Sequence, residues 1–334
     1  MTSPLSPQRL RSVAIGGLAL LMTSAFTISG IISSFAQSQY PTRRITIVVP
    51  FAPGSATDII GRVIAHEIEK AHGQPVIVEN RAGGGGNPGT AQVAKSAADG
   101  YTLLLGAIVT AANQSLYKNL SYNTKRDLIP ISQIASFPQL VAVHKSVGVE
   151  NIEQFIMIAN EKKLNAASSG IGTSQHLSAT LFELSTGVRF QHVYYKGSSA
   201  IVPDLVNGLV HVTFGDMVSL APALGDGSVK PIAVTSLQRS PKFPNLPTVD
   251  EAGLRGFTSA GWYGLFAPTG TPPEIIKLLY DTVKKATSNP EVIERIRVLG
   301  GEPVGSDPAT FAKFVDDETE RWGKVAKTFN ISIE

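Results

Sequence analysis

The sequence has no cysteine among its 334 residues. That absence excludes disulfide bridges, thiolate nucleophiles, cysteine-ligated metals and a lipid-modified N-terminal cysteine. An oxidising compartment permits disulfides without requiring them, so export stays compatible with this composition. Stability must come from a sizeable core, which a hydrophobic content of 43% can supply.

Familiar catalytic arrangements are missing as well. Glu67 follows His66, but the next histidine is His72, so the H-E-x-x-H spacing of zinc proteases does not occur. No G-x-S-x-G nucleophile elbow is present. His176 falls just inside a predicted helix, where a lone histidine is more often structural. We therefore expect no enzymatic activity, no metal and no cofactor.

Charge of one sign is not in excess either. The chain has 29 Lys+Arg against 26 Asp+Glu. Its first 36 residues hold two arginines and no acid, so the rest carries 27 basic and 26 acidic side chains. This balance gives no excess of positive charge of the kind that indicates a nucleic-acid partner or an anionic membrane surface.

Residues 1–36 are organised like a secretory signal peptide. Arg9 and Arg11 give a positive start, an apolar stretch follows, and small residues precede Gln37. An uncleaved anchor is the alternative, because residues 13–35 approach the ~20 that span a bilayer. Glycines and serines dilute that stretch and favour cleavage after Ala36. Removal of 36 of the 334 residues leaves a periplasmic protein of 298, long enough for two domains.

Short apolar runs alternate with amphipathic helical patterns, which is typical of an α/β fold with a largely parallel sheet. The predicted strands are Ile45–Val49, Val76–Val78, Tyr101–Leu105, Leu140–Val143, Leu164–Ala167, Phe190–Tyr194, Val210–Phe214 and Ile232–Thr235. The predicted helices are Thr57–Ala71 and three C-terminal ones that begin after Thr271, Asn289 and Asp307, with capping-box spacing from Thr271 to Glu274. No flexible linker divides the chain, which suggests two domains that the chain crosses more than once.

A loop of small residues joins the first predicted strand to the first helix. It reads Pro50-Phe51-Ala52-Pro53-Gly54-Ser55-Ala56-Thr57-Asp58. The N–H groups at a helix start, together with roughly half a positive charge, favour an anion there. Ser55, Thr57 and Asp58 can also cap the helix, so an ordinary βα turn explains the loop on its own.

A second loop repeats this arrangement more than 100 residues later. Ser168-Ser169-Gly170-Ile171-Gly172-Thr173 lies between a short strand and a helical pattern. Two such turns can hold one carboxylate from two sides with neutral donors. Such a site needs no arginine, which agrees with the balanced charge.

Two further features follow predicted strands. Gly84, Gly86 and Gly89 match the G-x-G-x-x-G spacing of dinucleotide-binding proteins. That function is rejected, because Pro88 interrupts the pattern and no acid follows ~20 residues later; a tight turn with close backbone approach is predicted instead. Asp216 stands at the end of a predicted buried strand, where a polar group faces a crevice, and is a candidate ligand contact.

Several segments together resemble the Bug-type extracytoplasmic receptors, the substrate-binding components of tripartite tricarboxylate transporters. The resemblance covers essentially everything after Tyr40. It is carried by Pro50-Phe51-x-Pro53-Gly54-x-x-Thr57-Asp58, Glu79-Asn80-Arg81-Ala82-Gly83 with Gly89-Thr90, Asp99-Gly100-Tyr101-Thr102-Leu103, Ala167-Ser168-Ser169-Gly170-x-Gly172-Thr173 with His176-Leu177, Tyr195-Lys196-Gly197, Pro247-Thr248-Val249-x-Glu251-Ala252-Gly253 and Trp262-Tyr263-Gly264-Leu265.

The resemblance implies an α/β, two-lobed periplasmic-binding-protein (Venus-flytrap) fold with crossover hinge strands. From the motif positions we expect the signal peptide at 1–36, the first lobe at 37–138 and again at 261–334, and the second lobe at 139–260. The implied ligand contacts are Phe51, Gly54, Ser55, Ala56, Thr57 and Asp58 in the first lobe, Ser168, Ser169, Gly172, Thr173 and Asp216 in the second, and Ala107 and Asn113 in a loop from Gly106 to Asn113. Ser55 departs from the usual Gly-Gly pair, and its hydroxyl either bonds the ligand or narrows the approach.

The function expected from these features is a receptor for a small carboxylate: a dicarboxylate, a tricarboxylate or an aromatic acid. It is expected to be a monomer that delivers its ligand to membrane transporter subunits. A ligand-sensing module for a sensor kinase is the alternative. An exported serine hydrolase using Ser168 or Ser169 with His176 is disfavoured, since no acid is evidently placed to orient that histidine.

Overall fold

The computed structural model describes residues 40–195, 197–225 and 227–332. The predicted signal peptide lies outside these residues. Within them, none of the helices combines the length and apolar character needed to cross a membrane. The elements described below belong to the unit that extends from Arg43 to Glu334.

One group of parallel strands comes from the first third of the chain. β1 (Ile45–Val49) lies between β2 (Val76–Asn80) and β3 (Thr102–Ala107) and is parallel to both. Four of the five β1 residues are fully buried. This is the burial expected of a parallel strand whose crossover helices cover both faces of the sheet, and it explains the uninterrupted apolar run.

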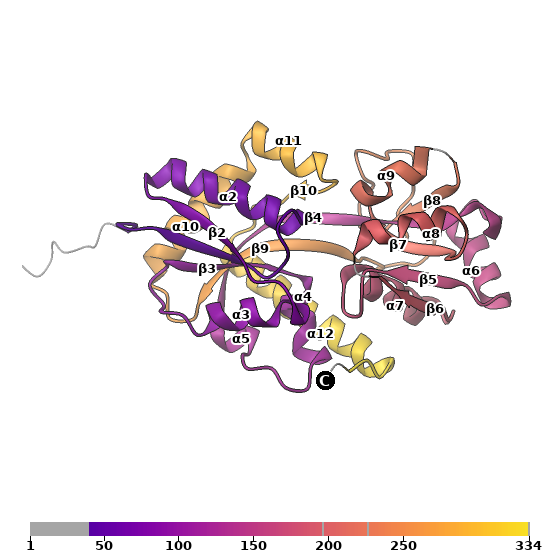
Figure 1. The fold of residues 1–334 in the computed structure, drawn as a ribbon, viewed down its shortest axis with the longest axis horizontal. Coiled ribbons are helices and arrows are strands. Elements are labelled where there is room, and N and C mark those ends of the chain that lie inside the picture. Colours follow the sequence, from indigo (N-terminus) through magenta and orange to yellow (C-terminus); the bar gives the residue numbers. More distant parts are fainter. Residues whose placement is uncertain (1–39, 196, 226, 333–334) are drawn as a thin grey trace, which may run out of the picture. The chain divides into compact units, whose positions relative to one another are not determined.

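A second parallel group forms from later residues. β5 (Asn165–Ser168) lies between β7 (Val212–Asp216) and β6 (Gln191–Tyr194). The helices of this second group are α6 (Ile152–Glu161), α7 (Ser174–Thr186), α8 (Val202–Val206) and α9 (Met217–Gly225). The strand β8 (Val229–Val234) is antiparallel to β4. Figure 1 shows these elements gathered around the C-terminal half of β4.

Two long strands, β4 (Leu128–His144) and β9 (Ala260–Pro268), connect the groups. β9 is antiparallel to β3 and to β4, and its pairing with β4 ends at Pro138. From Gln139 onward β4 pairs with β7 instead. The sheet order is therefore β2-β1-β3-β9-β4-β7-β5-β6, with β4 crossing from one parallel group to the other.

The remaining elements mostly pack against the first group. They are the helices α2 (Ala56–His72), α3 (Asn87–Ala94), α4 (Ile108–Leu116), α5 (Thr124–Asp127), α10 (Pro273–Thr287), α11 (Pro290–Val298) and α12 (Pro308–Thr328), the short strand β10 (Glu302–Pro303), and the single turns η2 (Gly84–Gly86), η3 (Lys145–Val147) and η4 (Ser198–Ala200). Of these, η3 and η4 follow the strands of the second group. Asn289 and Asp307 cap α11 and α12 as predicted.

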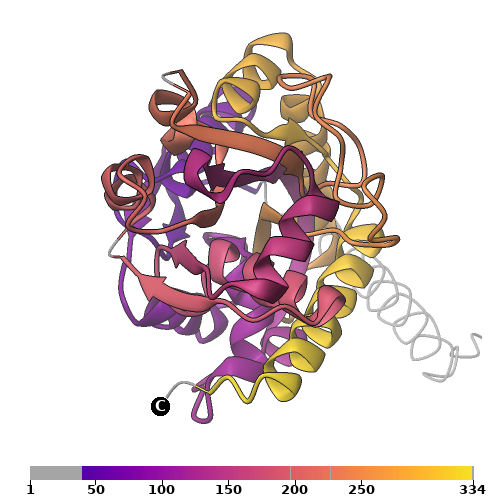
Figure 2. The same ribbon diagram turned by 90° about the vertical axis from the view of Figure 1, so that its right-hand side faces the viewer.

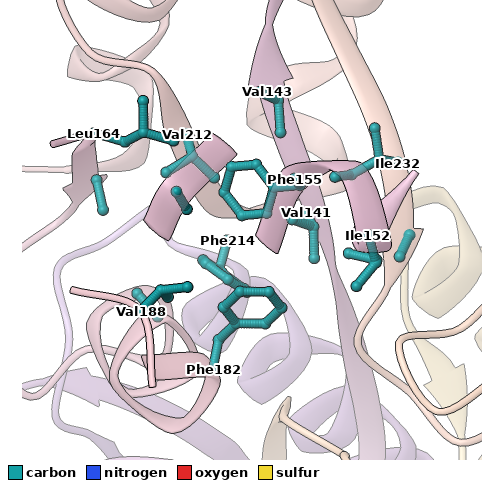
Figure 3. Packing of buried hydrophobic residues seen from close by; sticks show 14 of the residues in the cluster. Val141, Val143, Ile152, Phe155, Leu164, Phe182, Val188, Val212, Phe214 and Ile232 are labelled. Atoms are coloured by element: carbon teal, nitrogen blue, oxygen red, sulfur yellow. The ribbon is translucent and has the colours of Figure 1, made fainter. Parts of the chain in front are cut away.

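Each parallel group has its own apolar core. In the second group, Phe155, Phe182 and Phe214 are fully buried and meet Val141 of β4 (Figure 3). Full burial of one such ring stabilises the fold by ~1.5–3 kcal/mol. The first group buries Phe311, Trp322 and other side chains of α12 against β9 and α4.

Helix α7 contributes to both cores. Phe182 points into the core of the second group, whereas Leu177 packs with Trp322 and Val325 of α12 in the core of the first. α12 is the yellow helix in Figure 2 and runs past the second group. The turn that precedes α7 is therefore anchored through one helix to both groups of strands.

Several sequence expectations were wrong in detail. Residues 106–113 were expected as a loop, but they form the end of β3 and most of α4. The capping box at Thr271 is absent, because the Thr271 hydroxyl donates to the Pro268 carbonyl and Pro272 is the N-cap. The first half of β4 and all of β9 were not predicted. Seven of the eight predicted strands are confirmed with ends shifted by up to three residues, and the eighth, Leu140–Val143, is the C-terminal part of the longer β4.

Candidate functional site

The turn between β1 and α2 is organised by the buried carboxylate of Asp58. It accepts hydrogen bonds from the Gly54 N–H at 2.9 Å, from Asn80 Nδ2 at 2.9 Å and from Arg62 Nε at 3.0 Å. Asp58 was expected to contact the ligand. Its oxygens already have protein donors, so its evident role is to hold the turn.

Asp58 gives a pH-dependent prediction. Burial alone would raise the pKa of Asp58, but the hydrogen bonds from Arg62, Gly54 and Asn80 outweigh it and lower the pKa from its ordinary 3.8. A lowered native pKa stabilises the fold above the unfolded value, and this contribution is lost as the pH falls through the native pKa. We expect Asp58→Asn to cost about 2 kcal/mol at pH 7.

The measurement is urea unfolding of the wild type and Asp58→Asn at pH 7 and at pH 3. The difference in stability should shrink at the lower pH, because Asp58 of the unfolded wild type, with its ordinary pKa of 3.8, is then largely protonated and folding gains less from the charge. A difference that stays constant over this range would show that the charge of Asp58 does not organise the turn.

Ser55 is the N-cap of α2. Its Oγ accepts a hydrogen bond from the Asp58 N–H at 3.2 Å, so the hydroxyl caps the helix and its O–H can still donate to a ligand. Ala56 and Thr57 are the first two helical residues, so their N–H groups have no carbonyl within the helix to bind. Phe51 is half-buried, and its carbonyl accepts from Asn80 Nδ2 at 3.1 Å. The donors that this turn offers to an anion are therefore the N–H groups of the helix start and the Ser55 hydroxyl.

The glycine-rich segment from Gly84 to Gly89 packs against Pro50 at the start of this turn. Gly84, Gly85 and Gly86 all have positive φ angles, which confirms the predicted tight turn. A Cβ added at Gly89 would lie 3.1 Å from Pro50 Cβ, so the backbone approaches closely, as expected. Asn113 holds the segment from the other side, with Nδ2 donating to the Gly85 carbonyl at 2.9 Å. Asn113 is buried, and this hydrogen bond holds the glycine-rich segment in place.

Ala107 is also buried, at the end of β3. It stands opposite Tyr263 of β9 in the sheet register.

Tyr263 lies near the first predicted turn and near the end of β7, the parallel neighbour of β5. Burial raises its pKa, a hydrogen bond with the Thr57 side chain lowers it, and the negative charge of Asp216 raises it. The half-buried ring thus reaches Thr57 in the first turn and the neighbourhood of Asp216 at the end of β7. Sequence reasoning gave Tyr263 no role, although it lies inside the Trp262-Tyr263-Gly264-Leu265 segment that was singled out.

Asp216 ends β7 and begins α9. Its Oδ1 accepts from the Ser219 N–H at 2.8 Å and its Oδ2 from the Ser219 hydroxyl at 2.6 Å. In the sheet it stands opposite Gln139, the first β4 residue past the end of the β9 pairing. Asp216 therefore lies beside the crossing between the two strand groups, and its contact with a ligand stays a prediction.

The turn between β5 and α7 is held by the first helical residues after it. The Ser169 N–H donates to Gln175 Oε1 at 2.7 Å, and the Gly172 N–H donates to His176 Nδ1 at 3.2 Å. Thr173 is the N-cap, and its hydroxyl donates to the Gly170 carbonyl at 2.7 Å. Three of the four predicted contacts in this turn therefore make bonds within the protein.

Ser168 is different. It is 1% exposed, and its Oγ has no hydrogen-bond partner in the described part of the chain. Buried polar groups nearly always have a partner, and leaving one unpaired costs about 1–3 kcal/mol. A ligand oxygen bound at this turn would remove that cost.

The geometry does not support a serine hydrolase. Among the described residues the Ser168 hydroxyl donates no hydrogen bond to a base, and His176 Nδ1 already accepts from the Gly172 N–H. The nearby acid, Glu183, binds His192 Nε2 at 3.0 Å rather than orienting His176. Within the described residues no group of three or more His, Asp or Glu side chains is arranged to hold a metal ion.

A surface groove lies apart from these turns. It has a volume of about 980 Å³ and runs between α2 and α10, where His72 Nε2 lies 2.8 Å from Thr282 Oγ1. None of the residues expected to bind ligand lines it. The two turns, Tyr263 and Asp216 therefore remain the candidate site.

Comparison with known proteins points to one family. Residues 60–331 match the family model described as tripartite tricarboxylate transporter family receptor. A protein of the tcbD-tcbE intergenic region of Pseudomonas sp. strain P51 is 37% identical over 96% of this chain and 95% of its own length. Protein BugT of Bordetella pertussis is 35% identical over 90% of this chain and 93% of its own.

Solved structures agree with this assignment. The R. palustris protein Rpa4515, determined with adipate, superposes with a TM-score of 0.77 at 38% identity, covering 88% of this chain and all of that one. MatC from Rhodopseudomonas palustris, with bound malate, gives 0.72 at 33% identity, covering 86% of this chain and 99% of its own. The periplasmic binding protein BugD gives 0.74 at 31% identity, covering 88% of this chain and all of that one. The expected two-lobed α/β fold and the resemblance stated from sequence are confirmed.

Proposed function

Because this chain belongs to the receptor family of tripartite tricarboxylate transporters, we propose that it binds a small carboxylate between the β1–α2 and β5–α7 turns. The observation that carries the proposal is Tyr263, whose side chain interacts with Thr57 of the first turn and with the charge of Asp216 at the end of β7. Because β7 is the parallel neighbour of β5, its end lies at the sheet edge from which the β5–α7 turn starts. Residues far apart in the sequence thus approach one point beside the crossing strands.

In this proposal the ligand carboxylate accepts hydrogen bonds from neutral groups of both turns. The starts of α2 and α7 each contribute N–H groups and roughly half a positive charge. The adipate and malate bound by the two Rhodopseudomonas neighbours make linear dicarboxylates the first ligands to test. The tricarboxylate and aromatic acids expected from sequence belong in the same panel.

The proposed hinge lies where β4 changes partner. Its pairing with β9 ends at Pro138 and its pairing with β7 begins at Gln139, which supports a first lobe of 37–138 and 261–334 and a second lobe of 139–260. Closure about such a hinge would bring ligand contacts from both lobes together. We further propose that the protein acts in the periplasm as a monomer and passes its ligand to membrane transporter subunits.

A thermal-shift panel on purified residues 37–334 tests the proposal. Adipate, malate, citrate and benzoate would be compared with hexanol, which is apolar and uncharged. A ligand at about 100 times its Kd should stabilise the protein by about 2.7 kcal/mol. If no carboxylate in a broad panel raised the melting temperature and calorimetry detected no heat of binding, the proposed function would be wrong.

A further inference from the structure

We infer that Gln175 and His176 are positioning residues, which hold the β5–α7 turn in its ligand-binding conformation before any ligand arrives. This inference rests on the proposed function, since it concerns how that site is prepared. Neither side chain was expected to contribute to the site, and His176 was expected only to be structural. Both are on the first turn of α7 and are 3% exposed.

Gln175 secures the start of the turn. Its Oε1 accepts from the Ser169 N–H at 2.7 Å, and its Nε2 donates to the Ser198 hydroxyl at 3.0 Å. The side-chain amide thus connects the turn to η4, which follows the neighbouring strand β6. With its oxygen and its nitrogen both engaged, the orientation of this buried amide is determined by its partners.

His176 secures the end of the turn. Its Nδ1 accepts from the Gly172 N–H at 3.2 Å, so the ring proton of the neutral imidazole must be on Nε2. Nε2 lies 3.4 Å from the Tyr194 hydroxyl, and the His192 ring packs 5.1 Å away in an edge contact. Burial, followed by the neighbouring His192, lowers the pKa of His176 to about 4. The imidazole is therefore neutral and able to accept at neutral pH.

The segment between these two bonds would otherwise be free to move. Gly170 and Gly172 have φ angles of 127° and 79°, and Ile171 between them is half exposed. Glycine loses more conformational entropy than other residues when it is ordered. A turn that is already ordered before binding avoids that cost at the moment of binding, which raises affinity.

This arrangement also determines which donors remain for a ligand. The N–H groups of Ser169 and Gly172 are used by Gln175 and His176. The Ser168 hydroxyl has no partner within residues 40–195, 197–225 and 227–332. Ser174 and Gln175, as the first two helical residues, have N–H groups without a helical partner. The ligand contacts of this turn are therefore assigned to Ser168 and the start of α7.

Two substitutions of His176 separate the effect of losing its hydrogen-bond acceptor from the effect of changing the size of its side chain. His176→Asn keeps an acceptor oxygen near the place of Nδ1, whereas His176→Gln places its amide near Nε2 and removes that acceptor. In the ligand-free protein, NMR should show faster hydrogen exchange of the Gly172 amide in His176→Gln and near wild-type exchange in His176→Asn. The Gln175→Met side chain lacks the amide oxygen that accepts from Ser169, so the Ser169 amide should exchange faster in this variant than in the wild type.

Affinity is then measured by calorimetry with adipate and malate. His176→Gln and Gln175→Met should weaken binding about tenfold, and His176→Asn should stay within about threefold of the wild type. Unchanged Gly172 exchange in His176→Gln, or wild-type affinity in that variant, would overturn the inference. If the exchange results appear as expected but the wild type binds no carboxylate, the positioning holds and the proposed function fails.

Discussion

Replacing Ser168 by alanine should weaken carboxylate binding about 10- to 100-fold, because a hydrogen bond to a charged ligand contributes about 1.5–3 kcal/mol. The ligand-free protein should be at least as stable as the wild type, since the buried hydroxyl that is removed has no partner among the described residues. Calorimetric titration with the best ligand of the panel and urea unfolding of the ligand-free protein measure the two effects separately.

The matched control is Ser178→Ala in α7. Ser178 is also fully buried, but its hydroxyl lies 2.7 Å from the Ser174 carbonyl and 2.5 Å from the Ser259 hydroxyl. Removing it should lower stability by about 1–3 kcal/mol, because buried partners are left unpaired. If Ser168→Ala were as destabilising as Ser178→Ala and bound the ligand normally, the Ser168 hydroxyl would be structural.

Replacing Gly264 by alanine should destabilise the whole fold by about 3 kcal/mol, the upper end of the usual cost of overpacking. Gly264 is in β9, opposite Gly106 of β3 and Gln133 of β4. A methyl group there would overlap the ring of Phe311, which is fully buried on α12 and cannot move into solvent. The midpoint of urea unfolding should fall while the slope stays the same.

Gly225→Ala is the control for this substitution. Gly225 ends α9, and an added Cβ there meets no atom within 4 Å. Alanine has the higher helix propensity by about 1 kcal/mol, so the variant should be neutral or slightly more stable. Equal stability of the two variants would show that the contact between Gly264 and Phe311 is not tight.

Local patterns predicted the parallel strands well, and for a clear physical reason. β1 was predicted to the residue, because a strand buried on both faces requires a continuous apolar run bounded by turn residues. The first half of β4 and all of β9 escaped prediction because they break the same rules. Pro130 and Pro138 lie inside β4, and Gly261 and Gly264 inside β9, residues that normally argue against a central strand. The glycine at 264 is required by Phe311, which is distant in the sequence.

A candidate site could be proposed from sequence, but the roles of its residues could not be assigned. The two turns were identified because small residues at a helix start follow a strand in each. Which groups were already engaged depended on tertiary partners: Arg62 and Asn80 for Asp58, and His176 for Gly172. Tyr263 was missed because the strand that carries it was missed.

A crystal structure of residues 37–334 with a dicarboxylate bound tests the central claim most directly. The account predicts one carboxylate within hydrogen-bonding distance of the N–H groups of Ala56 or Thr57 and of the Ser168 hydroxyl, with Tyr263 beside it. A ligand bound instead in the groove between α2 and α10, near His72 and Thr282, would contradict the account.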